Sequence, residues 1–318
     1  MPIAKVSLIV PMYNASLYIR DCLDSISAQT LIPFEVILVD DASTDDTLDK
    51  IKGYPVTLLR LFINGGPAAA RNCGARSASG DVLIFTDADI RLGVDAVEKA
   101  MASLSQPSID AVSAKYSEDT PQSDFFSQFQ NLISIYRHRR LKESAAVTFS
   151  FFFVIKNDTF KRIGGFNEDM SYYEDVELGH RMVLRGFQCR LDPSLKVVHL
   201  KRYNHISLLR EYFNKCAAAN AYNLKQGFLW KIGNDNCPLG LKISGVSVFF
   251  IVVSLFFIPY SSKPIYIFLF IYSMGLFTFL VSCRRSFIFI VKSYTVFFEI
   301  SVMSLLGLIY GALKLKNA

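Results

Sequence analysis

Residues 36–47 read VILVDDASTDDT and join a strand, a polar turn and the start of a helix. The apolar run Phe34–Val39 is typical of a strand that is buried on both faces. Asp40 and Asp41 follow this strand directly, and Ser43–Asp46 supplies side chains that favour a helix N-terminus. This stretch therefore predicts a strand, an acidic loop and a helix in succession.

The same rhythm repeats on both sides of this stretch. Strands are expected at residues 6–10, 34–39, 56–62 and 82–85, and helices at 16–29, beyond 46 and at 68–77. Farther on, the pattern predicts a turn at 164–168, helices at 172–184 and 207–230, and a strand at 195–200. This alternation predicts an α/β fold, with a mostly parallel mixed sheet and helices on both of its faces.

Polar residues follow three of the expected strands. Tyr13–Asn14 follows the first, Asp40–Asp41 the second, and Asp87 and Asp89 the fourth. Loops at the carboxyl edge of a doubly wound sheet are where nucleotides bind. No G-x-G-x-x-G string follows the first strand, so a dinucleotide-binding dehydrogenase is disfavoured.

Asp87 and Asp89 belong to the string FTDADI, at the end of an apolar strand. Two carboxylates this close repel each other and are costly to desolvate, which a bound divalent cation would relieve. Mg²⁺ or Mn²⁺ accepts a few carboxylates and completes its shell with phosphate oxygens and water. The alternative is a solvated acidic turn. His199 could complete the metal shell, with His205 as the competing histidine.

Three other positions have candidate chemistry. Asp40–Asp41 could accept hydrogen bonds from a base imide or a ribose hydroxyl, or could cap the following helix. Arg71 could reach a phosphate or hold Asp87 in place, or could lie on the surface. The cluster of Glu174, Asp175 and Glu177 could include a base that deprotonates an attacking hydroxyl, although acids are also favoured at a helix N-terminus by its dipole.

Six strings resemble, in their order and spacing, the family 2 glycosyltransferases of GT-A fold. They are VSLIVPMYNA (6–15), VILVDDASTDDT (36–47), NGGPAAARNCGA (64–75), LIFTDADI (83–90), IGGFNEDMSYYEDVELGHRM (163–182) and VVHL (197–200). The resemblance covers residues 6–200, about two-thirds of the chain. It implies an inverting transfer of one sugar from a nucleoside-diphosphate sugar, with Mg²⁺ or Mn²⁺ as cofactor.

The resemblance also implies roles for individual residues. Asp175 would be the general base with Glu174 beside it, and Asp89 would be the direct metal ligand, with Asp87 and His199 as the other metal residues. The donor side would consist of Pro11, Tyr13, Asn14, Asp40, Asp41, Arg71, Asp87, Ala88 and Asp89. The acceptor or diphosphate side would include Gly164, Gly165 and Arg181.

The C-terminal part of the chain has the composition of a membrane region. The 318 residues are 51% hydrophobic with a mean hydropathy of +0.29, and residues 243–262 and 264–283 contain, apart from Lys263 between them, no charge. Each run is long enough to cross a bilayer as a helix. We expect a catalytic domain at 1–235 and a membrane region at 236–318. Its helices would lie at about 242–260 and 264–283, with a third, interfacial or membrane segment at about 286–313.

The net charge of +6 also comes from this region. Residues 1–240 hold 27 basic and 27 acidic side chains, so the basic excess flanks the apolar runs and does not indicate nucleic-acid binding. The N-terminus lacks a signal-peptide pattern, and the six cysteines form no CxxC pair. These features predict a cytoplasmic catalytic domain anchored to an inner membrane of bacterial or archaeal type, in contact with membrane lipids.

The acceptor is expected at the membrane. The Q-x-x-R-W string of processive polysaccharide synthases is absent, which favours a single addition to a polyprenyl phosphate or a lipid-linked saccharide. Three alternatives stay open: a nucleotidyltransferase, an enzyme resembling a processive polysaccharide synthase, and a non-catalytic nucleotide-sugar binder.

Overall fold

The structure is a computed structural model that describes residues 4–139, 141, 148–225, 243, 246–251, 254, 263–282 and 285–316. The chain forms two compact units. The first comprises Met1–Pro121 and Leu141–Lys201, and the second Gln122–Arg140 and Arg202–Ala318. The domain boundary expected at residues 235/236 does not coincide with a limit of either unit, and it stays a prediction.

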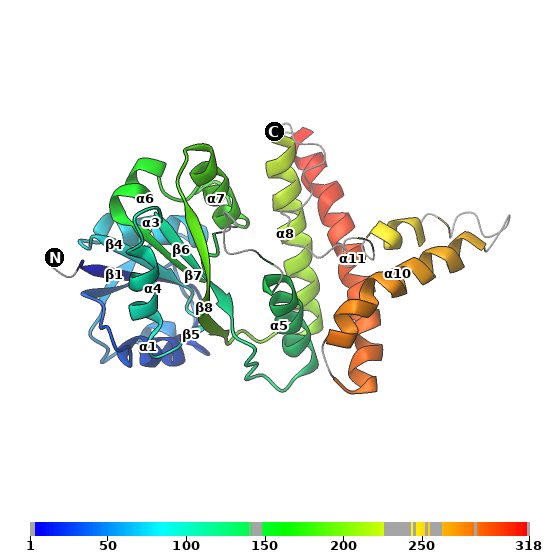
Figure 1. Ribbon diagram of the computed structural model, residues 1–318, viewed down its shortest axis with the longest axis horizontal. Coiled ribbons are helices and arrows are strands. Elements are labelled where there is room, and N and C mark those ends of the chain that lie inside the picture. The colour runs from blue at the N-terminus through cyan, green and yellow to red at the C-terminus, as the bar shows by residue number, and fades with distance from the viewer. Residues whose placement is uncertain are drawn as a thin grey trace. The chain divides into compact units, whose positions relative to one another are not determined.

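The first unit contains a sheet and the helices that cover it (Figure 1). Its strands are β1 (Val6–Met12), β2 (Glu35–Asp40), β3 (Thr57–Arg60), β4 (Val82–Thr86), β5 (Ile90–Leu92), β6 (Ala111–Tyr116), β7 (Phe152–Lys156) and β8 (Cys189–His199). Its helices are α1 (Ile19–Ser27), α2 (Thr47–Lys50), α3 (Gly66–Ser77), α4 (Ala96–Leu104), α6 (Asn157–Ile163) and α7 (Glu174–Leu184).

In the described part of the chain, eight strands form one mixed sheet in the order β3-β2-β1-β4-β7-β6-β8-β5. β3, β2, β1 and β4 run parallel, and β7 is antiparallel to both β4 and β6. Met12 pairs with Asp40 in register, so β1 and β2 end at the same level of the sheet. The predicted mixed sheet is therefore confirmed, and its parallel half brings the strand ends with polar residues to one edge.

Alternate residues of β1 enter two separate cores. Leu8 and Val10 pack with residues of α1 and α4, whereas Ile9 packs with residues of α3, α6 and α7. Because successive side chains of a strand point to opposite faces, helices cover both faces of the sheet, as the sequence predicts. Gly74 allows α3 to approach closely, since a Cβ there would lie 2.5 Å from Ile9 Cγ2.

The expected elements differ from the structure mainly at their ends and in the middle of the chain. The helix expected at 16–29 begins at Ile19 and ends at Ser27. The strand expected at 195–200 begins earlier, at Cys189. Sequence reasoning missed β5, β6, β7, α4, α5 and α6. The apolar run that forms β7 has no alternation because the strand is almost wholly buried, and such a run is hard to distinguish from a core helix.

The second unit is helical and contains α5 (Phe125–His138), α8 (His205–Lys225), α10 (Lys263–Ser282) and α11 (Phe287–Lys316). Residues 264–281 of α10 and 287–313 of α11 are long and apolar enough to cross a membrane. The segment expected at 286–313 is thus one continuous helix. Most of the helix expected at 242–260 lies outside the described residues. Within this range, residues 246–251 are described and are helical.

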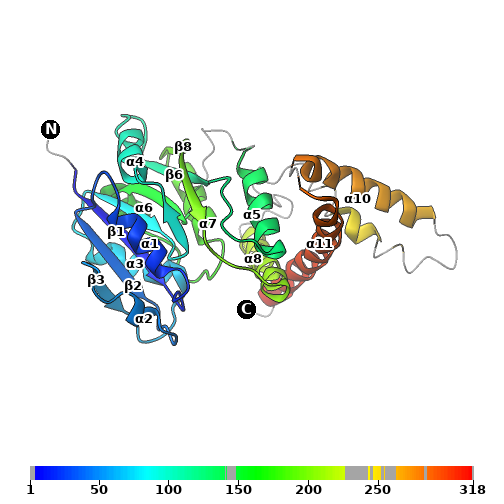
Figure 2. The same cartoon turned by 90° about the horizontal axis from the view of Figure 1, so that it is seen from below.

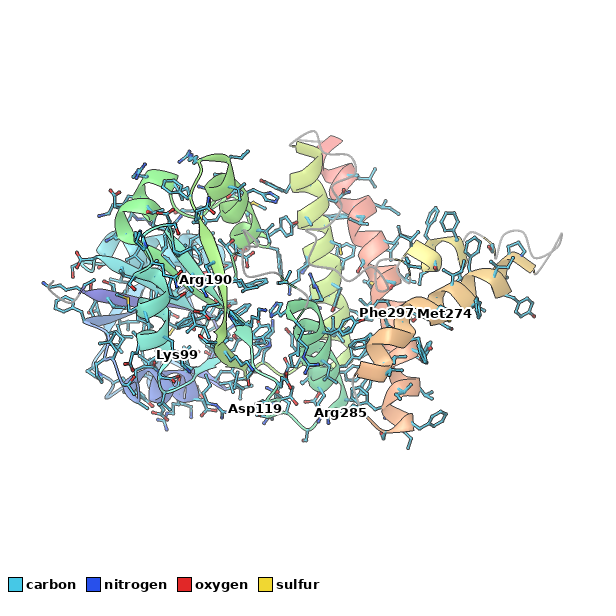
Figure 3. The ribbon with its side chains drawn as sticks, viewed as in Figure 1. Lys99, Asp119, Arg190, Met274, Arg285 and Phe297 are labelled. Atoms are coloured by element: carbon cyan, nitrogen blue, oxygen red, sulfur yellow. The ribbon has the colours of Figure 1, made fainter. Side chains whose placement is uncertain are left out.

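Helices α8 and α11 lie side by side in both views (Figure 1 and Figure 2). They run in the same direction, because Gly307 contacts Phe213 and Gly311, one turn on, contacts Ala217. A Cβ at Gly307 would lie 2.3 Å from Phe213 O, and one at Gly311 would lie 2.3 Å from Ala217 O. His205 Nε2 lies 2.5 Å from Glu299 Oε2 near the start of α8. Phe297 of α11 is buried, while Met274 of α10 is exposed (Figure 3).

Candidate active site

Asp40 and Asp41 hold the loops at the end of β2. Asp40 is buried and accepts hydrogen bonds from Ser43 N at 3.2 Å and from Arg60 Nε at 3.3 Å. Asp41 accepts hydrogen bonds from the backbone N–H groups of Gly65 and Gly66, both at 2.8 Å. Asp41 thereby fixes the loop that leads into α3.

The first-strand residues lie at the same edge. Pro11 pairs with Val39 in register, and Tyr13 is half-exposed immediately after β1. Asn14 Oδ1 accepts a hydrogen bond from Thr44 N at 2.8 Å, which ties the loop after β1 to the loop after β2. The structure therefore brings these residues of the predicted donor side together at one edge of the sheet.

Three non-glycine residues in the described part of the chain have positive φ, and each adjoins a predicted site residue or is one. They are Asn14 (49°), Ala42 (63°) and Tyr173 (74°). Such conformations cost energy in L-residues and persist where the surrounding structure enforces them, often at functional sites. Ala42 follows Asp41 directly, and Tyr173 precedes Glu174.

Arg71 is buried on α3 and bonds two acids from distant segments. Its Nη2 donates to Asp87 Oδ1 at 2.7 Å, and its Nη1 donates to Glu174 Oε1 at 2.8 Å. Burial alone would lower the pKa of Arg71, but the charges of Asp87 and Glu174 outweigh it and raise the pKa. Of the alternatives for Arg71, the structure shows the contact with Asp87 and not a surface position.

Asp89 faces His199 at the end of β4. Its Oδ2 lies 3.6 Å from His199 Nε2, and both side chains are partly exposed. The pairing of Ile90 with His199 and the hydrogen bond from Leu200 N to Asp89 O, at 2.8 Å, hold the two residues together. Ala88, between the two acids, is buried in the core.

These residues suit a hard divalent cation that is shared with a substrate. Asp89 and His199 offer a carboxylate and an imidazole side by side, and phosphate oxygens and water would complete the shell of Mg²⁺ or Mn²⁺. Asp87 has one oxygen bonded to Arg71 and a partly exposed side chain. Within the described ranges, no group of three or more His, Cys, Asp or Glu side chains forms a complete metal site.

Asp175 is half-buried in the first turn of α7. Its Oδ2 accepts a hydrogen bond from Ser150 N at 3.4 Å, and its Oδ1 accepts one from Val176 N at 2.8 Å. Thr148 Oγ1 donates to the backbone carbonyl of Asp175. Burial and then the charge of Glu174 raise the pKa of Asp175 to about 7, although Arg71 opposes this shift. A carboxylate with this pKa can accept a proton near neutral pH.

Arg181 and the two glycines form one structural unit. Arg181 donates to both carboxylate oxygens of Glu177 and to the carbonyls of Ile163 and Gly165. Gly164 has a φ of 87° and Gly165 one of 69°. The structure thus places Arg181 against the turn at 164–165, which it anchors to α7.

Asn72 adjoins Arg71 of the candidate site, and sequence reasoning assigned it no role. It donates to Phe166 O at 2.8 Å and to Glu168 Oε1 at 2.9 Å, and it accepts from Phe166 N at 2.9 Å. The only signal in the sequence is its place next to Arg71. The contacts of Thr148 and Ser150 with Asp175 could not be predicted, because they depend on tertiary structure.

Residues 7–164 match the family described as Glycosyl transferase family 2. The chain carries a glycosyltransferase family 2 domain. The matched range includes the strand ends with Asp40, Asp41, Asp87 and Asp89 and also Arg71, and it ends at Gly164, before Asp175 and His199.

Known relatives of the glycosyltransferase domain act on different compounds. A poly(ribitol-phosphate) beta-glucosyltransferase of Bacillus spizizenii is 38% identical over 101 residues, which cover 29% of this chain and 16% of the relative. A validoxylamine A glucosyltransferase of Streptomyces hygroscopicus subsp. limoneus is 28% identical over 217 residues, covering 57% of this chain and 48% of the relative. The aligned regions thus span less than half the length of these two relatives.

One solved structure resembles nearly the whole chain. The mannosyltransferase PcManGT of Pyrobaculum calidifontis, solved with GDP-Man and Mn²⁺, superposes with a TM-score of 0.59 at 22% identity. The match covers 98% of this chain and 87% of that protein. At this identity the likeness concerns the fold, and it confirms the GT-A fold of the glycosyltransferase domain.

Proposed function

We propose that this protein transfers one sugar, with inversion, from a nucleoside-diphosphate sugar to a hydroxyl or phosphate of a membrane-associated acceptor. The observation that supports this best is Asp175, whose carboxylate is held by Ser150 N and Val176 N at the edge of the sheet where nucleotides bind in α/β folds, and whose pKa is raised to about 7. A polyprenyl phosphate or a lipid-linked saccharide is the acceptor class we favour.

Asp175 takes the role of general base toward an acceptor hydroxyl. Its carboxylate accepts the hydroxyl proton while the hydroxyl oxygen attacks the anomeric carbon and the nucleoside diphosphate departs from the opposite face. One displacement of this kind inverts the configuration. Ser150 N and Val176 N hold the carboxylate in place for this step.

The donor side is proposed at the ends of β1, β2 and β4. Pro11, Tyr13, Asn14, Asp40 and Asp41 border the nucleoside. Asp41 acts partly through the loop it holds, since its oxygens bond Gly65 N and Gly66 N. Asp89 and His199, with Asp87 and the backbone of Ala88 alongside, would hold a divalent cation. That cation neutralises charge on the leaving diphosphate when it is bound.

The turn at Gly164 and Gly165 is proposed to border the acceptor or diphosphate side. Arg181 supports this turn through its bonds to Ile163 O and Gly165 O. We therefore assign Arg181 a positioning role.

The helical unit is proposed to bind the membrane, with α10 as the lipid-contacting helix and the catalytic domain on the cytoplasmic side. Exposed apolar side chains also line α11, among them Val291, Leu306, Ile309 and Leu313. However, α8 runs beside the C-terminal half of α11 and carries Arg210, Glu211 and Lys215.

Charged side chains are costly at the bilayer centre. An α11 that crossed the bilayer would draw α8 in with it, because Gly307 and Gly311 seat the two helices backbone to backbone. We therefore infer that α11 lies along the membrane surface. Short epitopes at residue 286 and at the C-terminus should be accessible from the same side of sealed vesicles, and opposite sides would contradict this arrangement.

The proposed reaction can be tested with membranes that contain the full chain. The membranes are incubated with UDP-glucose, UDP-GlcNAc or GDP-mannose and with Mg²⁺ or Mn²⁺, and nucleotide release and lipid-linked product are measured. We expect release of nucleoside diphosphate and addition of one sugar. Pyrophosphate release would favour a nucleotidyltransferase, a product with many sugars a processive enzyme, and donor binding without turnover a non-catalytic binder.

Two substitutions test the site in the same assay. Asp175→Asn should lower turnover about 10²- to 10⁴-fold while donor binding is kept. Asp158→Asn is the matched control, because this acid is 80% exposed on α6 and pairs only loosely with Arg162, at 3.7 Å. Equal activity of both variants would overturn the assignment of Asp175.

A further inference from the structure

Asp87 and Glu174 are linked through a single side chain. They lie 87 residues apart in sequence, Asp87 at the end of β4 and Glu174 at the start of α7, and each bonds a different Nη atom of Arg71. One acid lies on the donor side of the proposed site, and the other precedes the proposed base. The guanidinium therefore joins the two chemical halves of the site.

The environment of Arg71 gives this link little freedom. The Arg71 side chain is 3% exposed and the Glu174 side chain 8%. Arg71 Cζ also lies 5.4 Å from the centroid of the Phe166 ring. Arg71 Nε has no hydrogen-bond partner among the described residues, so its two ion pairs are its hydrogen bonds in this part of the chain.

Asp87 differs from Glu174 in exposure. The Asp87 side chain is 33% exposed, and its Oδ1 is the oxygen that bonds Arg71. A cation that approached Asp87, such as one carried by a nucleoside diphosphate, would compete with Arg71 for the charge of this carboxylate. Because one guanidinium serves both acids, a change in the charge of either acid alters the hold of Arg71 on the other.

We propose that Arg71 is a positioning residue that couples donor binding at Asp87 to the placement of Glu174 and thus of the base Asp175. The coupling rests on the proposed function and adds a regulatory link to it: donor binding loosens the Arg71–Asp87 bond, and Arg71 then holds Glu174 more firmly. The base is thereby fixed in place when the donor is present. The neighbouring Asn72 supports this arrangement by fixing Phe166, the ring that contacts Arg71.

The linkage predicts that a substitution at Glu174 changes affinity at the donor side. With Glu174→Gln, the charge of Arg71 is directed to Asp87 alone, and Asp87 attracts a metal–nucleotide less. We expect the Kd of the full-length protein for UDP or GDP with Mn²⁺, whichever the wild type binds, to rise about fivefold. Asp169→Asn, at an exposed position in the loop before Glu174, should leave that Kd unchanged.

The decisive comparison repeats Glu174→Gln in an Arg71→Lys background. Lysine keeps the positive charge, which protects folding, but an ammonium group lacks the rigid fork that bonds both acids at once. The effect of Glu174→Gln on the Kd should then disappear, and circular dichroism verifies that each variant is folded. If the effect persists in the Arg71→Lys background, or if Glu174→Gln has none in the wild-type background, the coupling is overturned. Absence of nucleotide binding by the wild type would instead overturn the proposed function, and the coupling with it.

Discussion

Gly165 lies so close to Asn72 that a Cβ atom at this glycine would be 2.7 Å from Asn72 Oδ1. The contact places the turn at 164–165 directly on α3, one residue from Arg71. The turn that precedes the candidate base is therefore held by the helix that carries the central arginine.

Gly165→Ala should destabilise the protein by about 2 to 3 kcal/mol, because the new methyl group clashes with Asn72 and alanine is strained at positive φ. Gly164→Ala is the matched control: its φ is also positive, at 87°, but a Cβ there meets nothing within 4 Å. It should cost only about 1 kcal/mol. Denaturant unfolding measures both, and equal losses would show that the contact with Asn72 is unimportant.

Ala42→Gly should stabilise the protein by about 1 kcal/mol, since glycine relieves the strain of a φ of 63°. Ala78 has an ordinary φ of −70°, so Ala78→Gly should destabilise by about 0.5 to 1 kcal/mol through the entropy of the unfolded chain. Opposite signs in thermal unfolding are thus expected. A loss of stability in both variants would argue against strain at Ala42.

Gly307→Leu and Gly311→Leu should each separate α8 from α11 or destabilise their packing by about 3 kcal/mol. The added side chains would collide with the α8 backbone at Phe213 and Ala217. Ile309→Phe adds volume on the half-exposed side of the same helix and serves as the control. Thermal unfolding of the detergent-solubilised full chain would reveal the difference, and similar stability of all three variants would contradict the close seam.

The fold could be predicted from the sequence where its determinants are local. The apolar runs of β1, β2 and β4, the glycine break before α3 and the acids at the strand ends all lie within short windows. The antiparallel insertion of β7 beside β4 could not be predicted, because it depends on long-range pairing and its apolar run shows no period. The division of the chain was also hidden, since α5 lies between β6 and β7 in sequence but belongs to the second unit.

The candidate site shows the same limit. Asp87, Asp89 and Asp175 could be proposed from their positions after a strand and at a helix start. The bonds from Arg71 to Glu174 and from Asn72 to Phe166 join residues 103 and 94 positions apart, and no local pattern specifies them. From the sequence, Arg71 could contact a phosphate, hold Asp87 in place or lie on the surface. Its burial and its two ion pairs exclude the surface position and show the contact with Asp87.

The raised pKa of Asp175 has a consequence for stability. Between pH 3.8, the ordinary pKa of an aspartate, and about pH 7, the folded protein binds a proton at Asp175 more tightly than the unfolded chain does. The stability that this proton contributes is present below about pH 4 and is lost as the pH rises through 7. Asp175→Asn removes the cost of the charge, so at pH 8 the variant should be more stable than the wild type, by about 1 to 2 kcal/mol. Equal stability of the two proteins at pH 8 in urea unfolding would contradict the shift.

The measurement that tests the central claim most directly is the pH dependence of kcat/KM for sugar transfer to a hydroxyl acceptor, because kcat/KM reports the pKa of the unliganded enzyme. If Asp175 is the base, kcat/KM rises with pH and is half-maximal near the Asp175 pKa of about 7. Asp175→Asn should abolish this rise with pH together with the activity. A kcat/KM that stays constant from about pH 5.5 to 8.5, or an active Asp175→Asn variant with the wild-type profile, would contradict the assignment of Asp175 as the base.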